Sequence, residues 1–435
     1  MNINFSKTHG RLRALHGVNN GPICFGGLTN LTEYHRALNI PSTRLHDCGW
    51  PHPVVVDVPA IFPVFSADEQ DPASYHFEAT DDYLASLVPL TKRVIYRLGT
   101  SIEHTARRYH THPPRDFAKW TRICVGMIRH FNEGWAGGHH FGIKDFEIWN
   151  EPDLGERMWS GTREQYFELY AQAARAIKAH DPSLRVGGPG LAFAAGEFAV
   201  AFLDFVRAQR LPLDFFSWHL YASEPVAEKR LALQVRAMLD ERGFQNSQSL
   251  LTEWNCFVGD WLRLHEPAHN RECFTRSRGP EGAALVASAL ILLQDAAVDE
   301  ANLYSGDTQW WGAFDEFGAP HKVYYGLLAF ARLMETPLRA AATGGDETTG
   351  LTVAAGLAED RRSAQVLVSN HRDGRSSYAL EMAGLPFKQG SAEIFLLDGK
   401  YDLQSVRTQD FSGAAITLQQ ELPAPSVALI RLREK

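Results

Sequence analysis

The feature that most constrains the fold is an alternation of strand-like and helix-like segments from about residue 11 to residue 335. Each short apolar, β-branched run is followed by a longer stretch with helical periodicity. Residues 164–180, for example, place their apolar side chains on one broad face and end at Asp181-Pro182. Eight such units in about 320 residues predict an α/β fold, a (β/α)8 TIM barrel with insertions. The expected barrel strands are Ala14–Val18, Ser42–Leu45, Arg93–Leu98, Asp145–Trp149, Arg185–Gly188, Phe215–Leu220, Ser249–Thr252 and Ala301–Tyr304.

A doubly wound open sheet is the structural alternative to a closed barrel. That fold binds nucleotides through a glycine-rich loop after its first strand. The pair Gly26-Gly27 does not make such a loop by itself. The pattern therefore favours the barrel.

The pattern changes after about residue 340, where residues 343–350 (TGGDETTG) form a turn-rich linker. Short strand-like runs follow, separated by turn signals such as Asp373-Gly374 and Asp398-Gly399. We expect residues 11–340 to form the barrel and residues 341–435 a smaller all-β sandwich, to which residues 1–10 could add a strand. The expected strands of the sandwich are Leu351–Ala355, Ala364–Ser369, Ser377–Met382, Ala392–Leu397, Ala415–Gln419 and Ser426–Leu432.

Two glutamates stand at the ends of predicted barrel strands. Glu151 closes the fourth strand in 146–152 (FEIWNEP), and Glu253 closes the seventh in 249–255 (SLLTEWN). The C-terminal ends of barrel strands form the active-site face, so the two carboxyl groups should meet across the barrel mouth. Cleavage of a glycosidic bond needs one protonated and one ionised carboxyl group.

Each glutamate taken alone could instead cap a helix or pair with an arginine. Because both strand ends carry Asn and Trp next to the glutamate, a catalytic role is favoured over these alternatives. The distance between the carboxyl groups would separate retention of configuration, at about 5–5.5 Å, from inversion, at about 6.5–9.5 Å. The sequence does not determine that distance.

Other residues at strand ends are candidates for substrate contacts. Asn150 could hydrogen-bond a sugar hydroxyl. His219 and Tyr221 share one face of the sixth strand, and one of them could hydrogen-bond Glu253 and keep it ionised. Arg44 and His46 share a face of the second strand, either as a sugar-binding pair or as a structural ion pair. The residues that could wall the site after the eighth strand are Tyr304, Asp307, Trp310 and Trp311.

No metal or organic cofactor is expected. Neither His110-x-His112 nor His139-His140 has a carboxylate or cysteine partner close in the sequence. The five cysteines are scattered and show no CxxC spacing, which argues against a zinc site or a disulfide framework. Glu103 is a third candidate carboxylate, ranked below Glu151 and Glu253.

Charge and hydropathy limit the partners. The formal charge of −8 argues against a nucleic-acid partner. The sequence also has no apolar run of 18 residues, the length that would predict a membrane span. The N-terminal residues lack the apolar core of a signal peptide. We expect a cytoplasmic protein, or a periplasmic one if a leader has been removed. The sequence leaves the oligomeric state open.

The ordered motifs resemble glycoside hydrolase family 39, the family of β-xylosidases and α-L-iduronidases. The resemblance runs from about residue 113 to residue 332 and rests on several segments in the family's order. These are 146–152 (FEIWNEP), 165–169 (QYFEL), 186–189 (VGGP), 214–223 (DFFSWHLYAS), 251–255 (LTEWN) and 317–325.

The resemblance implies a retaining enzyme with Glu151 as acid/base and Glu253 as nucleophile. It also implies that His219 and Tyr221 line the −1 subsite and that His46 and Asn150 contact the sugar. Two loops depart from the family xylosidases, because 101–114 is shorter and 305–311 has a Gly-Asp turn and two tryptophans. Both loops shape the sugar site.

The expected activity is therefore exo-acting and β-xylosidase-like, on terminal sugars of short plant-type oligosaccharides. Arabinosidase-type, galactosidase-type and transglycosylase activities would use the same carboxyl groups. An iduronidase would need a basic group for the sugar carboxylate, for which Arg107 and Arg108 are candidates. A catalytically silent carbohydrate-binding barrel is the alternative from outside the enzymes.

Overall fold

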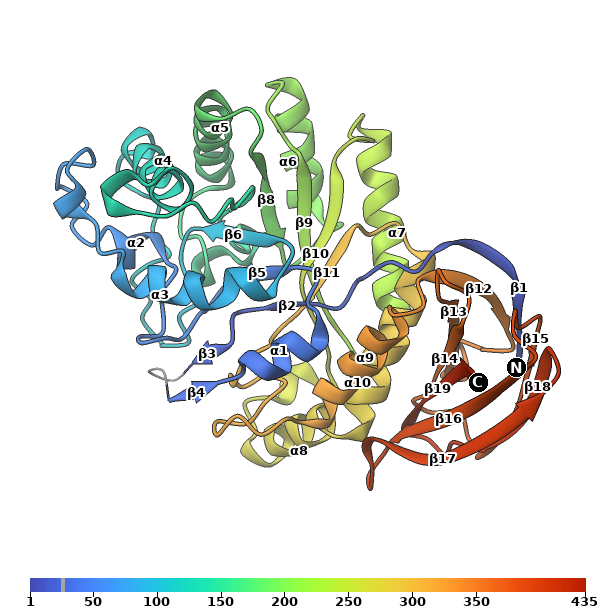
Figure 1. Cartoon of the computed structure of the whole chain (residues 1–435). Coiled ribbons are helices and arrows are strands. Elements are labelled where there is room, and N and C mark those ends of the chain that lie inside the picture. Colours follow the sequence, from blue (N-terminus) through green and yellow to red (C-terminus); the bar gives the residue numbers. More distant parts are fainter. Residues whose placement is uncertain (25–27) are drawn as a thin grey trace.

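The computed structural model describes residues 1–24 and 28–435, so Gly26-Gly27 lies outside the described residues. Eight parallel strands close into a barrel (Figure 1), which confirms the predicted fold class and all eight predicted strands. In barrel order the strands are β2 (Gly17–Asn19), β5 (Thr43–Leu45), β6 (Val94–Leu98), β7 (Asp145–Ile148), β8 (Arg185–Leu191), β9 (Phe215–Ala222), β10 (Gln248–Cys256) and β11 (Glu300–Leu303).

Helices surround the barrel, and their ends follow from local sequence signals. The Asp116 side chain caps α4 by accepting a hydrogen bond from the Lys119 N–H, and Gly134 ends that helix at φ +76°. Thr162 and Gln165 form a capping box at the start of α5. The helices are α1 (Thr32–Leu38), α2 (Val58–Ile61), α3 (Glu78–Leu87), α4 (Phe117–Glu133), α5 (Arg163–His180), α6 (Glu197–Ala208), α7 (Val226–Glu241), α8 (Pro267–Arg278), α9 (Pro280–Leu292) and α10 (Lys322–Leu333).

Charged side chains connect the strands at the N-terminal end of the barrel. Arg93, just before β6, donates to Asp145 of β7 at 2.6 Å and to Glu300 of β11 at 3.1 Å. Arg185 of β8 donates to the same Asp145 at 2.6 Å. Asp145 is buried, and such a group is tolerated in the interior only when it is paired in this way. The network fixes the strand ends opposite to those that carry Glu151 and Glu253.

The second domain is one nine-stranded sheet, mostly antiparallel, that folds over on itself around its own apolar core. Its two edge strands, β17 and β18, contact each other, and both chain termini lie in it (Figure 1). β1 lies between β12 and β15, so the first residues of the chain are an inner strand. In sheet order the strands are β17 (Asp402–Ser412), β16 (Gln389–Leu397), β19 (Ser426–Glu434), β14 (Ser363–Asn370), β13 (Leu351–Leu357), β12 (Leu338–Thr343), β1 (Asn2–Arg11), β15 (Ser377–Ala383) and β18 (Ala415–Glu421).

Two strands of this sheet differ from the expectation. β12 starts at Leu338, so the sheet begins three residues before the expected boundary at residue 341. Its sequence, LRAAAT, is rich in alanine, which is a weak strand former. β17 was not predicted, because it is an edge strand with a mostly exposed, polar sequence and little apolar alternation.

The β domain packs against the barrel through α9 and α10, which contact β13, β14 and β19. The Ser369 hydroxyl donates to the Ala284 carbonyl at 2.7 Å across this interface. Lys322 of α10 forms an ion pair with Asp402 of β17 at 2.7 Å. Within the described ranges, none of the helices has the length and hydropathy needed to cross a membrane.

Candidate active site

Backbone turns after β7 bring two side chains to the barrel interior beside Glu147, which belongs to the strand itself. Simple alternation from Glu147 would turn Trp149 inward, but Trp149 has φ +74° and packs against Trp159 at a ring distance of 5.0 Å. Glu151 follows at φ +44°. Positive φ values break the alternation of a strand. Consequently Glu147, Asn150 and Glu151 all reach the site.

A similar irregularity re-aims the end of β10. The pairing of β10 with β9 shifts register between Leu251 and Glu253, as in a β-bulge. As a result two successive side chains enter the interior. The Thr252 hydroxyl donates to Glu147 at 3.1 Å, and Glu253 accepts from Arg44 at 2.9 Å.

His219 of β9 connects the two glutamates. Its Nδ1 atom lies 2.9 Å from Oε1 of Glu151 and 3.8 Å from Oε2 of Glu253. One oxygen of each carboxyl group and this nitrogen all lie within 4.8 Å of one another. The side chains of Glu151 and Glu253 are 12% and 9% exposed, so both are largely shielded and still reach solvent.

Glu253 receives two strong hydrogen bonds. Tyr221 donates to its Oε1 at 2.6 Å, and Arg44 donates to its Oε2 at 2.9 Å. Donors of this kind stabilise an ionised carboxylate. Arg44 is fully buried and also donates to Glu147 at 2.7 Å and to Asn150 at 2.6 Å. The structure therefore places Arg44 in an ion-pair network beneath the site.

Glu151 has a different environment. Burial raises its pKa to about 7, although the charge of Arg44 opposes the shift. Burial also lowers the pKa of His219 to about 4, so its imidazole is neutral at neutral pH. One carboxyl group can thus hold a proton near pH 7, while the other accepts hydrogen bonds from an arginine and a tyrosine.

Three buried polar atoms around the pair have no hydrogen-bond partner in the described protein. They are Asn150 Nδ2, His219 Nε2 and His46 Nδ1. Buried polar atoms are almost always satisfied, so these are positions where hydroxyl groups of a ligand can bind. His46 also lies 3.3 Å from Asp47.

The two tryptophans expected at the site, Trp310 and Trp311, have different surroundings. Trp311 lies 5.1 Å from Tyr221 and stacks on Trp261 at 5.6 Å. Trp310 is 60% exposed and packs on Phe274. Trp311 and Trp261 therefore form an aromatic wall beside Tyr221, and Trp310 is a more peripheral residue.

The remaining candidates, Glu103, Asp307 and Tyr304, make hydrogen bonds within the protein. Glu103 accepts hydrogen bonds from the backbone of Tyr109 and His110 at 2.7 and 2.8 Å, so it closes its own loop. Asp307 accepts from Asn20 at 3.0 Å. The Tyr304 hydroxyl donates to Asp47 at 3.0 Å.

Sequence reasoning missed Glu147, Asp47 and Trp261. A charged residue between Phe146 and Ile148, in the interior of β7, was the available signal for Glu147. Asp47 is half-buried, its pKa is raised to about 7 by desolvation and by Glu253, and its φ is +56°. No local signal marks Trp261, which reaches Tyr221 from the short helix η5 (Trp261–Arg263).

The family model for glycosyl hydrolases family 39 matches residues 50–295, more than half of the chain. The chain belongs to this family. The match contains both Glu151 and Glu253 and the strands β6 to β10 that surround them.

Among curated relatives, a β-xylosidase from Geobacillus stearothermophilus is 26% identical over 320 residues. That alignment covers 66% of this chain and 58% of the relative. A β-xylosidase from Caldicellulosiruptor saccharolyticus is 35% identical over 155 residues, which is 33% of this chain and 31% of the relative. The chain thus spans less than two thirds of the length of these curated relatives.

Solved structures agree over the whole chain. A glucosidase from Croceicoccus marinus superimposes with a TM-score of 0.87 at 27% identity, covering 100% of this chain and 98% of that one. A monomeric β-xylosidase from Caulobacter crescentus has the same fold, with a TM-score of 0.75 at 16% identity and coverage of 100% and 99%. Both domains described above therefore have counterparts in these structures.

Proposed function

We propose that this family 39 protein is a retaining, exo-acting β-glycosidase of the β-xylosidase type. The observation that carries the proposal is the separation of less than 4.8 Å between carboxyl oxygens of Glu151 and Glu253. Retaining glycosidases hold their two carboxyl groups about 5–5.5 Å apart, and inverting enzymes need about 6.5–9.5 Å to admit a water. The short separation supports direct attack by one carboxylate.

In the first step, a carboxylate oxygen of Glu253 attacks the anomeric carbon of the terminal sugar. The bond from that carbon to the leaving-group oxygen breaks, and Glu151 gives its proton to that oxygen. The raised pKa of Glu151 suits a proton donor near neutral pH. Arg44 and Tyr221 hold Glu253 oriented for attack.

In the second step, Glu151 takes a proton from water as the water oxygen attacks the anomeric carbon. The bond to Glu253 breaks, and the free sugar leaves with its original anomeric configuration. The two carboxyl groups supply the acid, the base and the nucleophile, so the proposed reaction calls on no cofactor. A transglycosylase would differ only in that a sugar hydroxyl replaces the water.

The surroundings of the pair suit a single sugar ring. Asn150, His219 and His46 offer unpaired polar atoms for hydroxyl groups. Tyr221, which hydrogen-bonds Glu253, and the neighbouring Trp311 offer aromatic faces. A β-D-xyloside is the first candidate, from the names of the sequence relatives, and a β-D-glucoside is the second, from the glucosidase that matches the whole fold.

The test is hydrolysis of aryl β-D-xyloside, β-D-glucoside, α-L-arabinoside, β-D-galactoside and α-L-iduronide, with the anomer of the first product followed by NMR. We expect turnover of a β-xyloside or β-glucoside with retention. Glu253→Gln should lose roughly 10⁴-fold or more in kcat and keep its fold, as measured by circular dichroism. Glu241→Gln, at a side chain 74% exposed on α7, is the matched control.

Three results would overturn the proposal. An inverted product would exclude Glu253 as nucleophile, and full activity of Glu253→Gln would exclude the assignment of the site. Sugar binding without turnover of any glycoside, including natural oligosaccharides, would favour a silent carbohydrate-binding barrel.

A further inference from the structure

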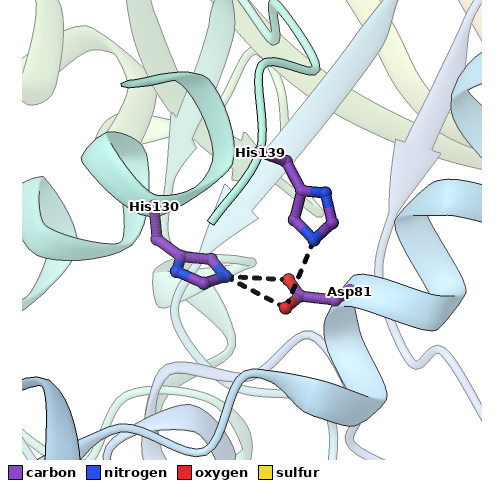
Figure 2. Close-up of side chains that lie close together, drawn as sticks. All are labelled: Asp81, His130 and His139. Atoms are coloured by element: carbon purple, nitrogen blue, oxygen red, sulfur yellow. Dashed lines mark hydrogen bonds and ion pairs between the residues drawn. The ribbon is translucent and has the colours of Figure 1, made fainter. Parts of the chain in front are cut away.

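A second group of imidazole and carboxylate side chains lies away from the active site. It consists of Asp81 on α3, His130 in the last turn of α4, and His139 in the loop that leads into β7 (Figure 2). That loop enters β7 at its N-terminal end, whereas Glu151 follows the C-terminal end. The cluster therefore has no part in the proposed hydrolysis.

The three side chains converge on one point. Nε2 of His130 lies 3.0 Å from both carboxylate oxygens of Asp81, and Nε2 of His139 lies 3.4 Å from Oδ2. In Figure 2 both rings direct a nitrogen at the carboxylate. Zinc ligands lie about 2.0–2.2 Å from the metal in a tetrahedron, so two of them are about 3.3–3.4 Å apart. The spacings from Asp81 to the two histidines, 3.0 and 3.4 Å, are close to that value, and the three ligand atoms all lie within 4.8 Å of one another.

Hydrogen bonding fixes the tautomer of the His130 ring. Its Nδ1 atom lies 2.9 Å from the Trp135 carbonyl, which only accepts, so Nδ1 carries the hydrogen. In a neutral ring, Nε2 then presents a lone pair to the lone pairs of Asp81. A cation between them, either a metal ion or a second ring proton, resolves this contact. A ligand histidine with its other ring N–H on a carbonyl is the usual arrangement at metal centres.

Packing holds both rings in place. His130 stacks on Phe77 with ring centres 3.5 Å apart, and His139 stacks on Phe141 at 4.4 Å. The His139 backbone N–H donates to the His130 carbonyl at 2.7 Å, which couples the loop to the end of α4. Gly138 permits this approach, because a Cβ there would lie 2.1 Å from the same carbonyl oxygen. Because both rings are already held in place, little conformational entropy would be lost when they bind a ligand.

We propose that Asp81, His130 and His139 bind one divalent transition-metal ion of the zinc class. The ligand set of two imidazoles and one carboxylate suits Zn²⁺, and water fills the fourth position of such three-ligand sites. The His139 side chain is 36% exposed, which gives the ion a path from solvent. The bound ion joins α3 to the loop between α4 and β7 and thereby stabilises the folded state.

The test uses the full chain after treatment with a chelator and dialysis. Isothermal titration with Zn²⁺ alone should show one equivalent bound, and Co²⁺ should give the visible absorption bands of a tetrahedral site. Zn²⁺ at 100 times its Kd should multiply the ratio of folded to unfolded protein about 100-fold and so raise Tm. kcat on the best aryl glycoside should stay within twofold.

Matched variants separate this site from other histidines. His139→Gln and Asp81→Asn should each abolish the stoichiometric binding and the rise in Tm. His140→Gln, at the exposed neighbouring histidine, should keep both, and so should Glu253→Gln, which alters the other cluster of carboxylates and imidazole. His139→Gln changes a partly exposed loop residue and tests the site even if Asp81→Asn does not fold.

Either of two results would overturn the proposal. The first is folded wild-type protein that binds no stoichiometric Zn²⁺ or Co²⁺, which would assign the cluster to a protonated His130 paired with Asp81. The second is binding that persists unchanged in His139→Gln.

Discussion

Tyr221 donates a 2.6 Å hydrogen bond to Glu253 from the neighbouring strand of the barrel. A hydrogen bond to a charged group contributes about 1.5–3 kcal/mol, and its loss corresponds to roughly 10- to 150-fold in rate. We expect Tyr221→Phe to lower kcat/KM by that factor with little change in Tm. Tyr325→Phe on α10 is the control. Unchanged kcat/KM in Tyr221→Phe would mean that the bond does not assist the nucleophile.

The effect of removing Glu151 on the reaction rate should depend on the leaving group. With Glu151→Ala, aryl glycosides whose phenol is a poor leaving group should lose roughly 10²–10⁴-fold in kcat/KM, since proton donation is lost. A dinitrophenyl glycoside needs no proton and should form the glycosyl-enzyme at a nearly normal rate. Steady-state and burst kinetics on both substrates measure the difference. An equal loss on both would contradict the role as general acid.

The raised pKa of Glu151 predicts the alkaline limb of the pH profile. The group must be protonated to act as acid, so kcat/KM should fall as pH rises through about 7. Glu151→Ala should lose this limb on an aryl glycoside whose phenol is a poor leaving group. A limb that persists near pH 7 in the variant would belong to another group, and Asp47 is the first to test, because its pKa is also raised to about 7.

The raised pKa of Glu151 also predicts how the stability of the fold depends on pH. The folded state holds the Glu151 proton more tightly than the unfolded chain, so this carboxyl destabilises the fold as pH rises from about 4.5 through 7. Glu151→Gln removes the ionisation and should raise Tm relative to wild type at pH 8, with no gain at pH 4. Thermal melts at both pH values check this. A gain of equal size at pH 4 would point to packing instead of charge.

The rigid guanidinium group of Arg44 hydrogen-bonds three groups of the site. Lysine has a single ammonium group and cannot reach Glu147, Glu253 and Asn150 together. Because it leaves a buried carboxylate poorly paired, Arg44→Lys should cost about 3 kcal/mol or more in stability and at least about tenfold in kcat. Urea unfolding and kinetics measure both. Arg36→Lys, in an exposed ion pair on α1, should change neither.

The N-terminal strand should stabilise the β domain. Phe5 of β1 is 2% exposed and packs in that core, so Phe5→Ala should cost about 3–5 kcal/mol of unfolding free energy. Lys7→Ala, at an exposed position of the same strand, is the control. Chemical denaturation followed by tryptophan fluorescence and circular dichroism would measure it. Equal effects of the two substitutions would contradict an inner position for β1.

Local patterns were sufficient for the barrel. Period-two and period-3.6 hydrophobicity are properties of neighbouring residues, so the eight strands and the two strand-end glutamates could be assigned before any contact was known. The polar edge strand β17 lacked that pattern and was missed. β12 was missed for a different reason, because its sequence LRAAAT is rich in alanine, which is a weak strand former.

The sequence by itself determined the order of strands, and with it the meeting of Glu151 and Glu253 at one end of the barrel. Only the tertiary structure decided how the side chains face one another. The positive φ at Trp149, the bulge before Glu253 and the ion pairs of Arg44 depend on packing between strands. The contact of Asp81 with His139 depends on it too, because the two residues come from separate elements. A spacing along the chain reports on one element, whereas charges, tautomers and possible ligands depend on distances between elements.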